Sequence, residues 1–212
     1  MRKNHLLALT VLLAAAQAGF AGSIAELTLN TSSISGTTGS IDFQFNPGPG
    51  TTQAATVQVL DFTSTGTYVA ASQQDIGAVS GGPVPSILTI SNTDADNEDF
   101  EDFTFGSSIF IELSFSGPAV TAPNGTATSP TTLYFSTFSD AAGTIPVLTS
   151  NSLGIDAEVT VNPSGSLSTS TTTPNANFVP EPSSAWLVSG ALLALGLVVR
   201  KTRAGISRGR LR

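Results

Sequence analysis

The chain of 212 residues has no cysteine, a single histidine (His5), and no lysine or arginine between Lys3 and Arg200. All 15 acidic residues, from Glu26 to Glu181, fall inside that interval. A domain in the middle therefore lacks the side chains for Schiff-base, histidine-base, cysteine-nucleophile and zinc chemistry. It also lacks the cations that hold phosphate groups or displace the counterions of nucleic acid. These absences predict a protein that is not an enzyme and has no nucleic-acid partner.

The N-terminus has the three parts of a secretory signal peptide. Two basic residues begin the chain, and an apolar run of 11 residues follows at positions 6–16. That run is shorter than the roughly 20 residues of a membrane-spanning helix. Small residues then offer cleavage after Ala18 or Ala21. We predict a signal peptide over residues 1–21, with an uncleaved N-terminal anchor as the alternative.

A second apolar segment lies near the C-terminus. Residues 185–199 carry no charge, and six of the last 13 residues are basic. A helix of that length spans about 22 Å, at roughly 1.5 Å per residue, and flanking residues can extend it. We therefore predict a single transmembrane helix over 185–199. The basic tail, beginning with Arg200, Lys201 and Arg203, should stop transfer and stay cytoplasmic. A buried core helix is the alternative.

The triplet Pro180-Glu181-Pro182 precedes this segment. Proline-glutamate-proline, a short apolar helix and an Arg-rich end, in that order, resemble the PEP-CTERM sorting signal of exopolysaccharide-producing Gram-negative bacteria. The resemblance covers residues 179–212. The stretch SIDFQFNPG at 40–48 is also similar to a recurrent subgroup of these proteins.

This resemblance implies a route rather than an activity. In that family, an exosortase in the inner membrane recognises the tripartite tail and sends the protein to the cell surface or matrix. By resemblance, Pro180, Glu181 and Pro182 are recognition residues, and the exosortase is the expected partner. The expected location is the inner membrane during sorting, with the C-terminus cytoplasmic, and then the surface or extracellular matrix. A single-pass anchor that is never cleaved is the alternative.

The region between the two ends alternates apolar and polar residues with a period of two. Turn signals such as Asn46-Pro47-Gly48 separate the alternating runs. This pattern predicts strands with one buried face each. We expect strands near residues 26–30, 41–45, 57–60, 87–91, 103–105, 109–115, 132–138 and 155–161. About eight such strands predict an antiparallel β-sandwich over residues 22–163, of jelly-roll or immunoglobulin-like topology.

Residues 164–178 are rich in serine and threonine and contain few apolar side chains. Such composition is typical of a flexible linker. We predict that this segment is a stalk between the sandwich and the sorting signal.

Residues 94–102 hold the densest group of acids. Asp94, Asp96 and Glu98 alternate in the way that oxygen ligands of Ca²⁺ do in a calcium loop. However, Asp99 stands where such a loop needs glycine. The two interpretations are a calcium site at Asp94, Asp96 and Glu98, and a solvated acidic loop between two strands. No other cofactor is predicted.

Two further functions remain compatible with this composition. A glycosidase needs only two carboxylates, and acids stand on or beside predicted strands. The candidates are Asp42, Asp61, Glu112, Asp156 and Glu158. A carbohydrate- or calcium-binding adhesin would use the aromatic residues, which are Tyr68, Tyr134, Phe100, Phe103 and Phe105. The main hypothesis is a structural or interaction protein of the envelope or matrix, with extracellular polysaccharide as a candidate partner.

Overall fold

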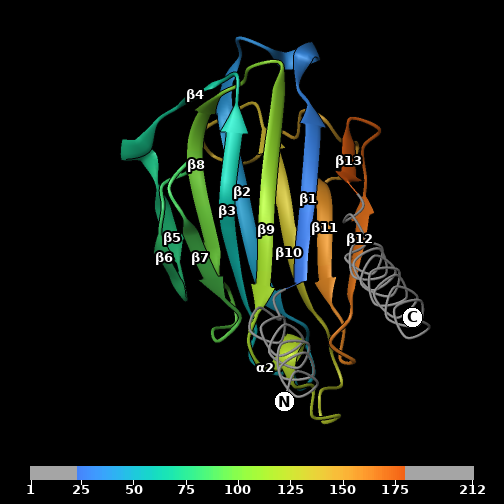
Figure 1. Cartoon of the computed structure of the whole chain (residues 1–212). Helices are drawn as coiled ribbons and strands as arrows, with labels where there is room; N and C mark the ends of the chain where they lie inside the picture. The colour runs from blue at the N-terminus through green and yellow to red at the C-terminus, as the bar shows by residue number, and fades with distance from the viewer. Residues whose placement is uncertain (1–22, 180–212) are drawn as a thin grey trace, which may run out of the picture. The chain divides into compact units, whose positions relative to one another are not determined.

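The computed structural model describes residues 23–179, which form two antiparallel β-sheets packed face to face (Figure 1). The predicted all-β sandwich is therefore confirmed. Within this range, no helix combines the length and the apolar character that a membrane crossing requires. The predicted signal peptide, the motif Pro180–Pro182, the segment 185–199 and the basic residues Arg200, Lys201 and Arg203 lie outside the described residues.

One sheet has six strands. They are β1 (Ser23–Asn30), β3 (Thr56–Ser64), β6 (Val79–Gly81), β7 (Leu88–Ser91), β9 (Ser108–Ser116) and β13 (Ala176–Val179). Their order across the sheet is β13–β1–β9–β3–β7–β6. The long strands β1, β9 and β3 lie at its centre (Figure 1).

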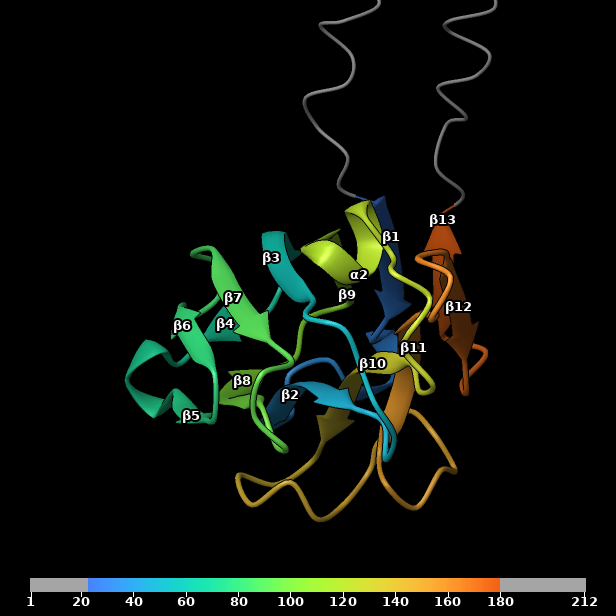
Figure 2. The ribbon, with the colours of Figure 1, turned by 90° about the horizontal axis from the view of Figure 1, so that it is seen from below.

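The other sheet has seven strands. They are β2 (Thr38–Pro47), β4 (Thr67–Tyr68), β5 (Gln74–Ile76), β8 (Glu98–Thr104), β10 (Thr131–Phe138), β11 (Ile155–Val161) and β12 (Leu167–Thr171). The order is β12–β11–β10–β2–β8–β4, and β5 pairs with β8 beside β4. Figure 2, which looks along the strands, separates the two layers.

The helices of the described region are short. They are η2 (Ser32–Ile34), η3 (Ala70–Ser72) and α2 (Pro118–Thr121). Longer connections join the strands, and residues 139–154 link β10 to β11.

The core forms between the sheets because alternate residues of each strand point to the same side. Phe62 of β3 contacts two rings of the opposite sheet, Phe43 at 6.2 Å and Phe103 at 5.9 Å between centroids. Both contacts are edge-to-face, and all three rings are almost fully buried. Such pairs stabilise the packing of the two sheets beyond the burial of apolar area.

All eight predicted strands are present, but the predicted stalk is not. Residues 167–171 form β12 on the edge of the seven-stranded sheet, and residues 176–179 form β13 on the edge of the other. An edge strand can carry polar side chains on both faces because its backbone supplies the pairing. Polar composition alone therefore did not separate an edge strand from a linker.

The acidic run also differs from the predicted loop. Residues 98–104 form β8, so Asp99 and Glu101 point to one face of the strand and Glu98 and Phe100 to the other. Asp94 and Asp96 are exposed in the turn between β7 and β8. The run thus places carboxylates on both faces of a central strand.

Candidate functional site

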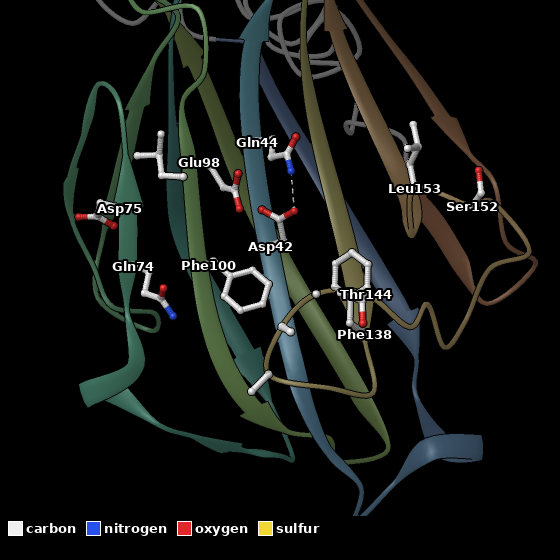
Figure 3. A pocket seen from close by; sticks show the side chains of 14 residues that line it. Asp42, Gln44, Gln74, Asp75, Glu98, Phe100, Phe138, Thr144, Ser152 and Leu153 are labelled. Carbon is white, nitrogen blue, oxygen red and sulfur yellow. Dashed lines mark hydrogen bonds between the residues drawn. The ribbon is translucent and has the colours of Figure 1, made fainter.

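A groove of about 810 Å³ lies on the outer face of the seven-stranded sheet, the face turned away from the core (Figure 3). The strands β2, β8 and β5 form its floor, and the connection 139–154 contributes one wall. Its lining residues are Asp42, Gln44, Gln74, Asp75, Ile76, Glu98, Phe100, Phe138, Ala141, Ala142, Gly143, Thr144, Ser152 and Leu153. The groove combines carboxylates, amides and two phenyl rings.

The strand register aligns these side chains in two rows. In one row, Gln44 of β2 stands opposite Glu98 of β8, and Glu98 stands opposite Ile76 of β5. In the next row, Asp42 stands opposite Phe100, which stands opposite Gln74. Side chains directly opposite each other have Cβ atoms about 4.5–5.5 Å apart. The rows run across the strands, so an extended ligand can contact several strands at once.

The first row continues beyond the groove. Tyr134 of β10 stands opposite Gln44, and Glu158 of β11 stands opposite Tyr134. Both side chains are partly exposed. An aromatic ring and a further carboxylate therefore extend the polar surface of the groove toward β11.

The wall over the groove is held in place by local hydrogen bonds. The Asp140 carboxylate accepts hydrogen bonds from the backbone N–H of Thr144 at 2.9 Å and of Ile145 at 3.0 Å. The Thr144 hydroxyl also donates to this carboxylate. The hydroxyl bond has the largest effect, and together with the backbone bonds it lowers the pKa of Asp140. Gly143 adopts a φ of +64°, and a Cβ there would lie 2.8 Å from the Phe100 ring. Glycine thus allows the wall to pack directly on the groove floor.

Asp42 is the most deeply buried carboxylate of the groove. Its side chain is 4% exposed, and its Oδ2 accepts a hydrogen bond from Gln44 Nε2 at 2.8 Å. Its Oδ1 is buried and has no hydrogen-bond partner among the described residues. Burial, followed by the charge of Glu98, raises the pKa of Asp42 to about 7. The groove therefore holds a carboxyl group whose charge the protein itself does not compensate.

The other carboxylates of the groove add charge of the same sign. Glu98 is partly buried, and burial and the charge of Asp96 raise its pKa. Asp75 is exposed at the margin on β5. Residues 23–179 contain no Lys, Arg or His, so no ion pair forms with these groups among the described residues. The negative potential of the groove is consequently open to a cation from outside.

A second carboxyl pair lies on the opposite face of β8. Asp99 and Glu101 are buried, and they accept hydrogen bonds from Gln73 Nε2 and the Val84 N–H, both at 2.8 Å. Burial and the charge of Glu101 raise the pKa of Asp99 to about 8. The neutral form of Asp99 is thus favoured in the folded chain, and its buried Oδ2 has no hydrogen-bond partner among the described residues. This pair does not line the groove, and it is a structural element of the interior.

The predicted calcium site is not formed. Among residues 23–179, no three acidic side chains are grouped as metal ligands, so Asp94, Asp96 and Glu98 do not converge. Instead, the buried Asn97 organises the turn. Its Nδ2 donates to the carbonyl oxygens of Phe45 and Asp94, and its Oδ1 accepts from the Ala78 N–H. An amide side chain thus supplies the contacts that a calcium loop would obtain from the ion.

The five acids proposed for a glycosidase do not gather at one place in the fold. Asp61 and Glu112 face each other across β3 and β9 of the six-stranded sheet. Asp156 is fully buried and accepts a hydrogen bond from the Thr137 hydroxyl at 2.6 Å. Asp42 alone of the five lines the groove, and Glu158 lies in the row beside it.

The proposed aromatic patch is divided between core and groove. Phe103 and Phe105 are each 1% exposed and belong to the core, where the Tyr68 ring contacts Phe103. Phe100 lines the groove, and Tyr134 extends its row. Two residues of the groove, Gln44 and Gln74, were not predicted. The alternation of polar and apolar residues predicts that both side chains point outward from their strands. It does not predict the register of β2, β8 and β5, which brings them to one groove.

Comparisons with protein-family models, with curated proteins and with solved structures found no match to this chain. Its function must therefore be inferred from the groove and from the sequence.

Proposed function

We propose that the chain is an exported, non-enzymatic protein of the cell envelope or extracellular matrix, and that its sandwich binds a polysaccharide. The observation that supports binding is the groove across β5, β8 and β2. Amide and carboxylate side chains hydrogen-bond to sugar hydroxyls, and phenyl rings pack against the apolar faces of sugar rings.

The delivery of the protein is part of the same proposal. A signal peptide over residues 1–21 would export the chain, and residues 185–199 would hold it in the inner membrane as a transmembrane helix. An exosortase would then act at Pro180-Glu181-Pro182. The order of motif, apolar segment and basic tail supports this route.

For the sandwich itself, we propose an immunoglobulin-like topology in preference to a jelly roll. Two pairings support it. β2 pairs with β8, and β3 pairs with β9, as the B–E and C–F strand pairs of immunoglobulin domains do.

The binding proposal is tested by retention of the purified chain on immobilised neutral, anionic and cationic polysaccharides. We expect retention on at least one of them, and we expect it to fall about tenfold or more in the double variant Gln44→Ala, Gln74→Ala. Gln58→Ala is the matched control, because Gln58 lies on the other sheet, where it donates to Thr89 Oγ1. Unchanged retention in the double variant would exclude the groove as the binding site.

Two additional measurements separate the alternatives. Loss of binding with a chelator would indicate a calcium-dependent adhesin. The protein and the polymer would then each supply oxygen ligands to the calcium ion. Release of reducing ends from the polymer would indicate a glycosidase. The observation that favours the latter is a carboxyl with a pKa of about 7 beside a second carboxylate in a groove, as in acid–base pairs of glycosidases.

A further inference from the structure

Within residues 23–179, the groove carries carboxylates and no basic side chain that could neutralise them. Asp42, Glu98 and Asp75 line it, and Asp96 adds a nearby negative charge. All basic residues of the chain lie outside residues 23–179. A buried charge destabilises a fold unless it is paired, so the buried Asp42 needs a proton, a metal ion or a charged ligand.

The unpaired oxygen of Asp42 bears on whether a metal ion or a charged ligand occupies the groove. Asp42 is 4% exposed, lines the groove, and has one oxygen, Oδ1, without a partner among the described residues. A metal ion needs several converging ligands, and no three acidic side chains of residues 23–179 are grouped in that way. An ammonium group needs fewer acceptors, because it is a compact charge with three donors.

The acceptors that an ammonium group requires lie together on one face of the sheet. The Nε2 of Gln44 donates to Asp42, which leaves Oε1 of Gln44 as an acceptor. Glu98 stands directly opposite Gln44 on the neighbouring strand. Asp42, two residues from Gln44 on β2, points to the same face. The carboxylates of Asp42 and Glu98 therefore lie near each other in the groove, while Gln44 turns its amide nitrogen to Asp42 and its oxygen away from both (Figure 3).

The rest of the groove suits a sugar rather than a simple amine. Phe100 lies in the row next to Gln44 and Glu98, and Tyr134 flanks Gln44 on its other side. Leu153, which is 70% exposed, and Ile76, which is 49% exposed, add apolar surface. Aromatic faces attract both cations and the apolar faces of sugar rings.

We infer that the groove recognises a polysaccharide with free primary amino groups, one of which is seated against the carboxylates of Asp42 and Glu98. The inference rests on the proposed function, because it names the class of polysaccharide that the groove binds. A polymer of partly deacetylated amino sugars has this chemistry. An anionic polymer is repelled by the same carboxylates.

The experiment is calorimetry with the purified full-length chain and three probes at a pH of about 7, where Asp42 is partly ionised and sugar amino groups are partly protonated. The probes are a glucosamine hexamer, an N-acetylglucosamine hexamer and spermine. We expect the glucosamine hexamer to bind at least about tenfold more tightly than either of the others, as expected for a charge-assisted contact. Asp42→Asn should remove this preference. Asp61→Asn, which changes the net charge equally on the other sheet, should retain it.

The possible results separate the two proposals. Equal binding of both hexamers would overturn the preference for amines and leave polysaccharide binding in place. Binding of spermine as tight as that of the glucosamine hexamer would also overturn the inference, because it would show attraction of any cation. Equal loss of glucosamine-hexamer binding in Asp42→Asn and Asp61→Asn would show that net charge governs the binding. It would also overturn the inference. No retention of the chain on any polysaccharide would remove the proposed function itself.

Discussion

Asp42 lies in a groove in which its neighbours carry the same sign of charge. Its burial and the charge of Glu98 both favour the protonated form in the folded state. The folded chain therefore binds more protons than the unfolded chain between the ordinary pKa, near 3.8, and the raised value of about 7. Over this window the free energy of unfolding falls as pH rises, and it levels off above it.

We predict that Asp42→Asn stabilises the protein at pH values above the folded-state pKa. The asparagine removes the buried charge, so the free energy of unfolding should rise by about 1–3 kcal/mol there. Below the unfolded pKa the two proteins should be equally stable, since Asp42 is then protonated in both states. Urea unfolding at both pH values measures the difference.

The control for this prediction is Asp61→Asn. Asp61 is exposed on the six-stranded sheet, and its substitution should change the free energy of unfolding by no more than about 0.5 kcal/mol. The pKa values of Asp99 and Asp156 are also raised, to about 8 and about 7. Both residues are present in every variant, so they contribute the same pH dependence to the free energy of unfolding of each. If Asp42→Asn were less stable than the parent chain at high pH, the buried charge would not be the destabilising group.

At the scale of elements, β12 and β13 are the last two strands of the described residues. Each forms one edge of a different sheet. β12 pairs with β11, and β13 pairs with β1. Ala176 of β13 is 6% exposed and stands opposite the buried Leu29. These strands give the serine- and threonine-rich segment a structural role that its composition did not indicate.

We predict that removing residues 164–212 destabilises the sandwich, whereas removing residues 180–212 does not. Loss of β12 and β13 uncovers β11 and β1, and exposing one side chain of the size of Leu29 costs about 1.5–3 kcal/mol. Urea midpoints of the two truncated chains measure the effect. Equal midpoints would show that the segment is the linker that its composition suggested.

At the scale of the whole molecule, the distribution of charge divides the chain into parts with different roles. The acidic residues, except Glu181, all fall within residues 23–179, and the basic residues all lie outside that range. A domain without cations is repelled by anionic lipid and by nucleic acid. The proposed delivery would separate the acidic sandwich from the basic tail.

We predict that replacing Pro180, Glu181 and Pro182 by alanine leaves the full-length chain in the inner membrane. The exosortase would no longer recognise the tail, while residues 185–199 would still hold the chain in the bilayer. Fractionation and immunoblotting of cells that express the parent or the variant chain measure this. The control variant is Ser168→Ala, Thr169→Ala, Ser170→Ala, a triple substitution away from the motif that should not alter sorting.

Identical fractionation of the parent and the Pro180–Pro182 variant would exclude the motif as a sorting signal.

The sequence by itself determined the two-sided strands, the all-β class and the absence of cations from the sandwich. These follow from local alternation and from composition, which every strand carries in its own residues. The alternation also placed Asp42 and Gln44 on the face opposite Phe43.

The tertiary structure decided which strands are neighbours, and that choice created the groove. Gln44 and Glu98 are 54 positions apart in the chain and stand opposite each other only through the pairing of β2 with β8. It also brought Asp42 and the connection 139–154 to the same groove, and it made Asn97 the hydrogen-bonding centre of the turn between β7 and β8. Contacts between distant segments depend on register and on loop packing, which no local pattern specifies.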